Sequence, residues 1–499
     1  MSAVAIPLKA STRNGSTFFK QHKPGIPSTA TDICFMKAVD MAALLREKKI
    51  SAREIMQAHL KQIEKINTKV NAIITHVPEE ELMAQALAAD ESLAKGKING
   101  LLHGLPIAVK DLTETKGIRT TYGSPIWKDF IPTQDSLLVE RERKAGAIII
   151  GKTNVPELGM GSQTFNPLFG PSFNPYDISK TCGGSTGGGA IALACGMTPL
   201  ADGSDMGGSL RNPGSFCNVV GLRPSPGRVP ITAAKLGWQN LGVVGPMARN
   251  VADCAFLLSV QAGYDSRSPI SIMESPQQFL QPLHRDFKNT KVAFIKSLGL
   301  PWETEVKDAI NKQRKVFESL GCIVEENEPD MTDANECFVN FRHWQYEAQY
   351  GDLLAANGDK MNAYTKWHIA EGRNLTGPYL SRLEMKRTAL YRRMQQFLEK
   401  YEFLIMPVSQ VLPFDVKTPY PTEIEGEKML TYIDWMRSSY YISIVGNPAI
   451  SVPCAFSKKG LPIGIQIVGR HNADFSVLQM GFAFEQVTNI GSQRPKIVG

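Results

Sequence analysis

The highest concentration of glycine and hydroxyl residues lies between Cys182 and Cys217. Two Gly- and Ser-rich clusters, at 183–189 and 203–209, flank a short apolar run that is typical of a helix. Because glycine tolerates positive φ and close approach of the backbone, paired turns of this kind can bring several N–H groups to one small volume. Such a volume would bind an anion or an oxyanion.

Three hydroxyls in the clusters are candidate nucleophiles for acyl chemistry, namely Ser185, Ser204 and Ser209. A serine attacks a carbonyl only when a neighbouring base takes its proton, so a base is needed as well. A flexible Gly/Ser linker is the alternative interpretation of this composition. The helix-like run, Asp205 fixed among glycines, and the closing Arg211-Asn212-Pro213 count against a linker.

Lys110 is the candidate base, near the end of a short apolar strand predicted over 103–111. Ordinarily a lysine at a strand end points into water. A buried ammonium would instead lose hydration, and its pKa would fall until the neutral amine exists near pH 7. A lysine in that state can act as a general base.

Two other motif matches are rejected on their context. Residues 146–153 fit the P-loop pattern, but the β-branched run lies between the glycines and Pro156 follows the lysine closely, so a sheet strand is predicted there. Residues 183–187 fit the nucleophile elbow, which needs an apolar strand before it, whereas 174–181 is polar and turn-like. Residues for a Ser-His-Asp triad are nevertheless present, since four histidines lie downstream outside any convincing site motif: His284, His343, His368 and His471.

Gly183–Gly188 and Gly203–Pro213 together resemble the signature of the amidase signature family of amide hydrolases. The resemblance extends from about residue 40 to residue 490. It implies a Ser–cis-Ser–Lys triad with Ser209 as nucleophile, Ser185 as bridging serine after a cis peptide bond, and Lys110 as base. Three positions depart from the family pattern, where Ser, Ile and Ala are usual: Thr186, Leu210 and Gly214.

The resemblance also implies a mechanism. Neutral Lys110 would accept a proton from Ser185, which takes one from Ser209, and Ser209 would attack the carbonyl carbon to form an acyl-enzyme. An oxyanion hole is expected from four backbone N–H groups, those of Met206, Gly207, Gly208 and Ser209. Supporting roles are expected for Asp205, Thr186 and Arg211.

A strand–helix–strand pattern over 291–325 and further strands after residue 400 predict the α/β class. The resemblance implies a single large α/β/α domain over 36–499, with a central mixed β-sheet covered by helices on both faces. Residues 1–35 lack periodicity, so an arm that drapes over the surface or is partly disordered is expected. The helical, aromatic-rich segment 335–400 is expected to cover the pocket, with ordinary helix packing as the alternative.

The loop after the first strands contains three phenylalanines among turn residues. It is predicted to form one wall of the substrate pocket, through Gln163, Phe165, Phe169 and Phe173. The alternative is that these aromatic rings anchor the loop to the core.

Composition narrows the choice of partners and compartment. The net charge of +7 over 499 residues, without a run of like charges, gives no case for nucleic acid. Eight cysteines without a C-x-x-C pair indicate reduced thiols in a cytoplasmic protein, and no metal or other cofactor is expected. We see no secretory signal and no apolar stretch long enough for a transmembrane segment.

These expectations define a hydrolase of a small apolar or aryl amide, acting as a monomer or homodimer. A carbamate (urethane) or ester hydrolase with the same triad is the first alternative, because the same oxyanion site serves all these acyl compounds. The second is the glutaminase subunit of a tRNA-dependent amidotransferase. A non-catalytic binding protein on this scaffold is a further rival, although all three triad residues are present.

Overall fold

The computed structural model describes residues 18, 19, 24–233 and 235–499. Eleven strands form its main sheet. They are β1 (Ile73–His76), β2 (Pro106–Lys110), β3 (Ile148–Thr153), β6 (Leu200–Asp205), β7 (Val220–Arg223), β8 (Val243–Ala248), β9 (Lys291–Phe294), β10 (Ile323–Glu326), β11 (Phe403–Pro407), β14 (Ala449–Phe456) and β15 (Pro462–Gly469). Two small hairpins lie apart from this sheet, β4 (Phe165–Asn166) with β5 (Gly170–Pro171), and β12 (Glu423–Ile424) with β13 (Glu427–Lys428).

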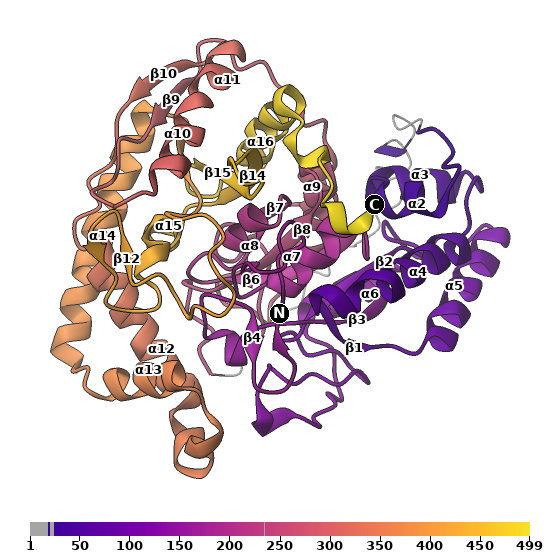
Figure 1. Ribbon diagram of the computed structural model, residues 1–499, viewed down its shortest axis with the longest axis horizontal. Coiled ribbons are helices and arrows are strands. Elements are labelled where there is room, and N and C mark those ends of the chain that lie inside the picture. Colours follow the sequence, from indigo (N-terminus) through magenta and orange to yellow (C-terminus); the bar gives the residue numbers. More distant parts are fainter. Residues whose placement is uncertain (1–17, 20–23, 234) are drawn as a thin grey trace, which may run out of the picture.

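The sheet is mixed, with the order β1-β3-β2-β6-β8-β7-β14-β15-β11-β9-β10. Strand β2 pairs in parallel with both β3 and β6, whereas β6 pairs antiparallel with β8. Helices flank the sheet (Figure 1). The predicted α/β class and mixed sheet are therefore confirmed.

The helices alternate with these strands along the chain. They are α2 (Ala30–Phe35), α3 (Ala38–Arg46), α4 (Ala52–Val70), α5 (Glu79–Ala94), α6 (Leu137–Lys144), α7 (Gly187–Ala194), α8 (Arg211–Phe216), α9 (Val251–Gln261), α10 (Thr304–Lys312), α11 (Arg314–Ser319), α12 (Ala334–Asn357), α13 (Ala363–Arg373), α14 (Gly377–Lys400), α15 (Arg437–Val445) and α16 (Asp474–Thr488).

Local sequence explains where α4 begins and ends. The Ser51 hydroxyl accepts the N–H of Glu54, and the Glu54 carboxylate accepts the N–H of Ser51, which together form a capping box. At the other end Asn71 adopts the left-handed conformation that often terminates a helix. The helix thus has satisfied backbone groups at both ends.

Alternate residues of β14 face different helices. Ile450 and Val452 lie against Gly481 of α16, whereas Ser451 between them lies against Gly214 of α8. Successive side chains of a strand point to opposite faces of its sheet. Helices α8 and α16 therefore cover opposite faces, and α8 occupies the face from which it can meet the signature loops.

Two segments differ from the predictions made from the sequence, and a third agrees with them. Residues 203–205 belong to strand β6 and not to a turn, so the Gly-rich turn begins only at Met206. The single helix expected within the strand–helix–strand pattern over 291–325 is divided into α10 and α11. The segment 146–153 contains β3, as the rejection of a P-loop predicted.

The expected N-terminal arm falls largely outside the described residues. Within it, Ala30–Phe35 forms α2, which is capped by Thr29 and Asp32. Phe19 is buried and packs edge-on against Phe256. The described end of this segment is thus structured and in contact with the core.

All eight cysteines are free and buried, as predicted for reduced core thiols. Within the ranges given above, none of the helices combines the length and the apolar character that crossing a bilayer requires.

Candidate functional site

Lys110 ends β2 and has no exposed surface. Its Nζ lies 2.8 Å from the Ser185 hydroxyl, 2.8 Å from the Thr186 hydroxyl and 2.9 Å from the Ser204 hydroxyl. The lysine therefore does not point into water, and its nitrogen contacts three hydroxyl groups. Ser204, which is absent from the expected triad, is one of them.

Burial lowers the pKa of Lys110 to about 7, and the carboxylates of Asp202 and Asp205 oppose that shift in part. At neutral pH a large share of the amine is then uncharged. A neutral amine carries a lone pair, so it can accept a proton from a hydroxyl that it touches. The site thus contains a base of suitable strength beside two serines and a threonine.

The turn before α7 presents Ser185. The peptide bond between Gly184 and Ser185 is cis, as the resemblance implied. Gly184 packs so closely on the main chain of Gln163 that a Cβ there would lie 2.9 Å from the Gln163 carbonyl carbon. Gly184 can therefore carry no side chain in this arrangement.

Ser209 lies in the turn between β6 and α8 and is partly exposed, whereas Ser185 is only 2% exposed. The Thr186 N–H donates to the Ser209 carbonyl at 3.3 Å, which joins the two Gly-rich clusters. Of the two serines expected in the triad, the partly exposed Ser209 is the one that an incoming substrate can reach more easily.

The backbone of residues 206–209 supplies unpaired donors. Among the described residues we find no hydrogen-bond acceptor for the N–H groups of Met206, Gly207 and Ser209. The Gly208 N–H, which was also expected in the oxyanion hole, donates to the Asp205 carboxylate at 3.1 Å. Three of the four expected donors are thus free to bind a ligand, and the fourth shapes the loop.

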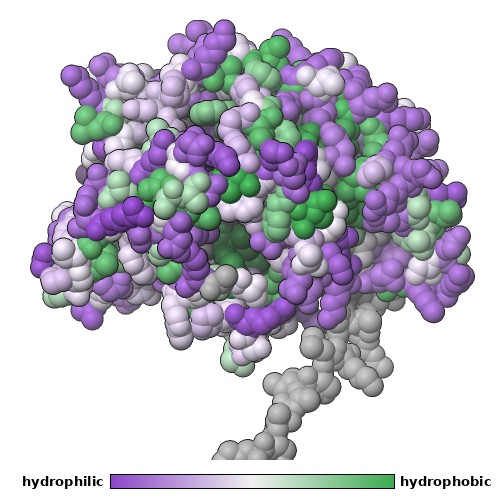
Figure 2. All heavy atoms as spheres, turned by 90° about the horizontal axis from the view of Figure 1, so that it is seen from below, coloured by the Kyte–Doolittle hydropathy of each residue, from purple (hydrophilic) through white to green (hydrophobic). Residues whose placement is uncertain are grey.

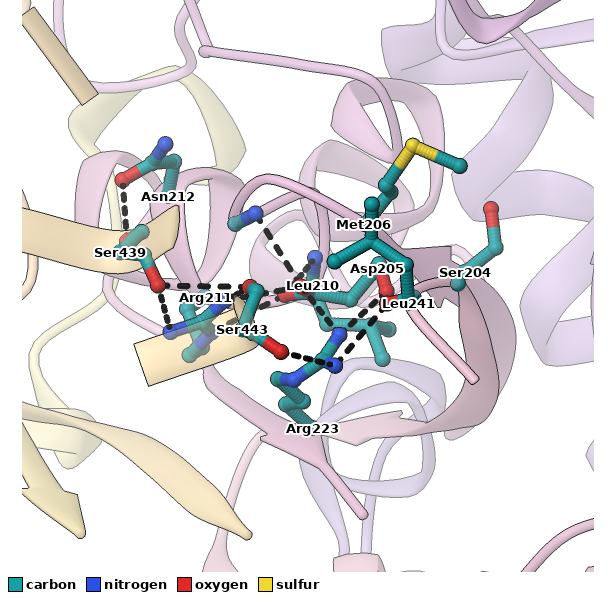
Figure 3. A network of polar contacts seen from close by, with 12 residues as sticks. Ser204, Asp205, Met206, Leu210, Arg211, Asn212, Arg223, Leu241, Ser439 and Ser443 are labelled. Atoms are coloured by element: carbon teal, nitrogen blue, oxygen red, sulfur yellow. Dashed lines mark hydrogen bonds and ion pairs between the residues drawn. The ribbon is translucent and has the colours of Figure 1, made fainter. Parts of the chain in front are cut away.

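Asp205 holds that loop through a buried ion-pair network (Figure 3). Its carboxylate accepts bonds from Arg211 at 2.8 and 3.0 Å, from Arg223 at 3.1 Å, and from the Leu210 N–H at 3.1 Å. Although burial disfavours the charge, the two guanidinium groups hold the pKa of Asp205 well below its usual range. A permanent carboxylate therefore fixes the turn that leads into α8.

Arg211 extends the network to other elements. It donates to the Ser439 carbonyl at 2.8 Å, the Ser443 hydroxyl at 2.7 Å and Gln466 Oε1 at 2.6 Å, so it joins the loop to α15 and β15. Figure 3 shows Ser439 and Ser443 near Asp205 and Arg211, while the Met206 side chain extends away from them. The loop is thus held in place by contacts with α15 and β15.

A second set of buried charged residues, Asp202 and Lys152, lies near Lys110. It was not predicted from the sequence. Asp202 Oδ1 accepts the Lys110 main-chain N–H at 2.5 Å, and its Oδ2 has no partner among the described residues. Burial raises the pKa of Asp202 to about 6 and lowers that of Lys152 to about 8. Asp202 did offer a signal in the sequence, because a carboxylate within a largely apolar run is rarely buried unless it is paired.

A cavity of about 760 Å³ is lined in part by Met206, whereas Lys110, Ser185 and Ser209 are not among its lining residues. Its lining also includes Tyr122, Trp127 and Phe130, together with Gln345 and Tyr350 of α12. The face in Figure 2 is also hollowed near its centre, with hydrophobic residues in the hollow. Part of the 335–400 segment, namely α12, thus contributes to this cavity wall.

The residues expected to form the pocket wall do not line this cavity. Phe165 is 43% exposed on the β4–β5 hairpin, and Phe169 lies beneath the Arg119 guanidinium, 5.5 Å from its centre to the ring. Phe173 forms a bridge with Thr181. Gln163 is buried and donates to the Pro419 carbonyl at 2.8 Å, so only its main chain approaches the cis peptide. The aromatic residues that do line this cavity come from distant segments, so no local pattern groups them.

The described ranges hold no group of three or more His, Cys, Asp or Glu side chains close enough to bind a metal ion. Three of the four histidines named as candidates for a serine–histidine triad make other contacts. His343 and His368 contact each other, and His471 packs edge-on against Tyr391.

A buried amine among hydroxyls, beside free backbone N–H groups, has the composition of an acyl-transfer site.

Comparison with known proteins agrees with an enzyme of the acyl-transfer class. The family model described as "Amidase" matches residues 54–478. An acylamidase of Rhodococcus erythropolis is 32% identical over 94% of this chain and 98% of its own length. A subunit of the Glutamyl-tRNA(Gln) amidotransferase of Alkaliphilus metalliredigens is 34% identical over 92% of this chain and 98% of its own.

Among solved structures, a bacterial aryl acylamidase of the amidase signature enzymes superposes with a TM-score of 0.85 at 26% identity, covering 92% of this chain and 99% of that one. The chain belongs to the amidase family, and we assign it to the amidases, which are hydrolases of amide bonds.

Proposed function

We propose that the chain hydrolyses a carboxylic amide through an acyl-enzyme on Ser209. The observation that carries this proposal is the 2.8 Å contact between the buried Lys110 Nζ and the Ser185 hydroxyl. In the neutral amine this contact runs from the hydroxyl to the nitrogen lone pair. Ser185 then passes its proton to Lys110 as it takes one from Ser209, and the Ser209 oxygen bonds to the carbonyl carbon.

The developing oxyanion is bound by the unpaired N–H groups of the 206–209 loop. Loss of one such donor typically costs about 3 to 4 kcal/mol of barrier. The proton then returns through Ser185 to the leaving nitrogen, and the C–N bond breaks. Water attacks the acyl-enzyme by the same relay, which releases the acid and restores Ser209 and neutral Lys110.

Thr186 and Ser204 hold the amine in place during this cycle. Both hydroxyls lie within 2.9 Å of Lys110 Nζ, so the ammonium that forms transiently has three oxygen acceptors. The Thr186 hydroxyl also donates to the Ser204 carbonyl at 3.3 Å. These two contacts fix the Thr186 hydroxyl at a position where the family pattern usually has a serine.

A small apolar or aryl amide is the substrate class that we propose. The cavity at Met206 is large enough for a drug-sized molecule, and aromatic side chains form one of its walls. Relatives named as an acylamidase and an aryl acylamidase support this choice. A carbamate or ester would meet the same nucleophile and oxyanion site, so these compounds belong in the same assay.

The glutaminase function of an amidotransferase is the second candidate, because the Alkaliphilus protein of that name matches almost the whole chain. The two candidates predict different products and partners. An amidase releases amine from aryl or fatty amides alone, whereas an amidotransferase subunit releases ammonia from glutamine and co-purifies with a second protein.

The experiment is therefore a panel of aryl amides, fatty amides, carbamates, esters and glutamine, with the wild type and two variants. Ser209→Ala should abolish hydrolysis of every substrate. Ser204→Ala is the matched control, since it removes a hydroxyl that also contacts Lys110 but leaves the nucleophile. Undiminished turnover by Ser209→Ala would overturn the proposal, and turnover of glutamine alone would favour the second candidate.

A further inference from the structure

Arg342 is a buried cation with an unusual set of partners. It lies on α12, is 5% exposed, and donates to His368 Nε2 at 3.1 Å, to the Tyr432 hydroxyl at 2.9 Å and to Met206 Sδ at 3.2 Å. None of these acceptors is a carboxylate or a carbonyl, and the described residues form no ion pair with Arg342. The other buried guanidinium groups near the site, by contrast, pair with Asp205.

The histidines beside Arg342 supply no charge of opposite sign. Because Arg342 donates to His368 Nε2, that nitrogen is unprotonated, and the proton of this ring lies on Nδ1, 3.0 Å from His343 Nδ1. Burial and the nearby guanidinium lower the pKa of both imidazoles, that of His343 to about 4. Arg342 therefore carries the only formal charge among these three side chains at neutral pH.

Burying a charge without an opposite charge is costly, and proteins normally pair it or use it to bind a ligand. The Tyr346 ring, whose centre lies 4.8 Å from the Arg342 guanidinium carbon, offsets part of that cost through a cation–π contact. Arg342 has five N–H hydrogens, of which the three contacts use three. A thioether is also a weak acceptor. Two N–H hydrogens of the guanidinium thus remain available to an additional acceptor.

Arg342 lies on the helix face that meets the oxyanion loop. One turn earlier, the Phe338 ring would lie 3.3 Å from a Cβ at Gly207, and one turn later Gln345 lines the cavity. Met206, which accepts from Arg342, lines the same cavity. Its side chain is unbranched and adaptable, and Figure 3 shows it extending away from the Asp205 network. A ligand oxygen that displaces the Met206 sulfur would reach the guanidinium directly.

We propose that Arg342 binds a carboxylate on the substrate, so that the preferred amides carry a negative charge beside their apolar or aryl part. This inference rests on the proposed amidase function and narrows its substrate class. A planar guanidinium binds a carboxylate through two parallel hydrogen bonds, which a neutral amide cannot match. The Met206 sulfur accepts from Arg342 at the position that the carboxylate would take.

Two matched pairs of anilides test the inference and identify the half of the substrate that carries the charge. For the acyl half, N-phenylsuccinamate is compared with N-phenyl-4-methylpentanamide. For the leaving half, 4-acetamidobenzoate is compared with 4-isopropylacetanilide. Aniline release gives kcat/KM for each compound. The wild type should prefer the charged member of one pair by about 10- to 100-fold, the range for hydrogen bonds to a charged group.

Arg342→Gln should bring that ratio close to one, and Arg342→Lys should leave it between the two. Arg314→Gln removes a cation of the same kind from α11, where Arg314 pairs with Glu318, and should leave the ratio unchanged. Circular dichroism checks the fold of each variant. A wild-type ratio near one in both pairs, or a ratio that Arg342→Gln leaves intact, would overturn the inference while amide hydrolysis stands.

Calorimetric titration separates this failure from failure of the proposed function. Ser209→Ala binds the preferred charged anilide without cleaving it, and the double variant with Arg342→Gln should bind it at least about 10-fold more weakly. If the wild type cleaves no amide but this difference in binding is found, Arg342 binds a carboxylate and only the proposed amide hydrolysis is contradicted. Equal binding by both proteins contradicts the role of Arg342 directly.

Discussion

Replacing Lys110 with methionine should abolish catalysis and stabilise the fold at the same time, by an amount that falls as the pH rises. The physical reason is that folding buries an amine which water would keep protonated. Lowering its pKa from 10.5 to about 7 corresponds to about 5 kcal/mol. The free energy of unfolding is reduced by this amount at pH values where the amine is charged in both the folded and the unfolded state. Methionine fills a similar volume without a charge.

The sign follows from proton binding. The folded state releases the Lys110 proton near pH 7, whereas the unfolded state keeps it until about pH 10.5. Because the unfolded state binds more protons over that range, wild-type stability rises with pH there. The advantage of Lys110→Met is therefore largest below pH 7 and should shrink by about 3 kcal/mol between pH 7 and pH 9.5.

Thermal unfolding of both proteins across this pH range measures the difference. For a chain of this length about 1 kcal/mol shifts the midpoint by about 1 °C, so the gap should narrow by about 3 °C. The exposed Lys116→Met is the control, and its difference from the wild type should not follow this curve. A Lys110→Met gap that stays constant from pH 7 to pH 9.5 would refute the buried, neutral lysine.

Other perturbations of the site have equally direct outcomes. The kcat/KM of the wild type should rise with pH through an apparent pKa near 7, and Asp202→Asn should move that pKa down because it removes a charge that favours the ammonium. Asp205→Asn leaves two buried guanidinium groups without their carboxylate, so it should cost about 3 to 5 kcal/mol and lower the unfolding midpoint by about 3 to 5 °C. Gly184→Ala places a Cβ 2.9 Å from backbone and should inactivate the enzyme, whereas Gly377→Ala, with open space around it, should not.

Local patterns predicted the α/β class and several individual elements, whereas the single domain with a mixed sheet was implied by the resemblance. The capping box at Ser51, the apolar strand that ends at Lys110 and the β-branched run at 148–150 each identify their element through contacts within a few residues. The strand 203–205 was missed because glycine and serine favour turns, and only pairing with β8 makes these residues a strand. Pairing of that kind joins segments far apart in the chain, so no local pattern reports it.

The sequence predicted those site residues that lie in the Gly- and Ser-rich signature or at Lys110. The cis peptide and the contact between Lys110 and Ser185 agree with the resemblance. The cavity was not predictable, because its wall combines the segment around Trp127 with α12, and the loop phenylalanines pack elsewhere. Arg342 was also missed, since its lack of a carboxylate partner is visible only when all its neighbours are placed.

The acyl-enzyme is the most direct test of the account. Wild-type protein is mixed with a slowly hydrolysed aryl ester or amide, quenched in acid within the first turnover, and mapped by peptide mass spectrometry. The proposed mechanism predicts the acyl group on Ser209, its absence in Ser209→Ala, its persistence in Ser204→Ala, and much slower formation in Lys110→Met. An acyl group on any other residue, or full activity without Ser209, would contradict it.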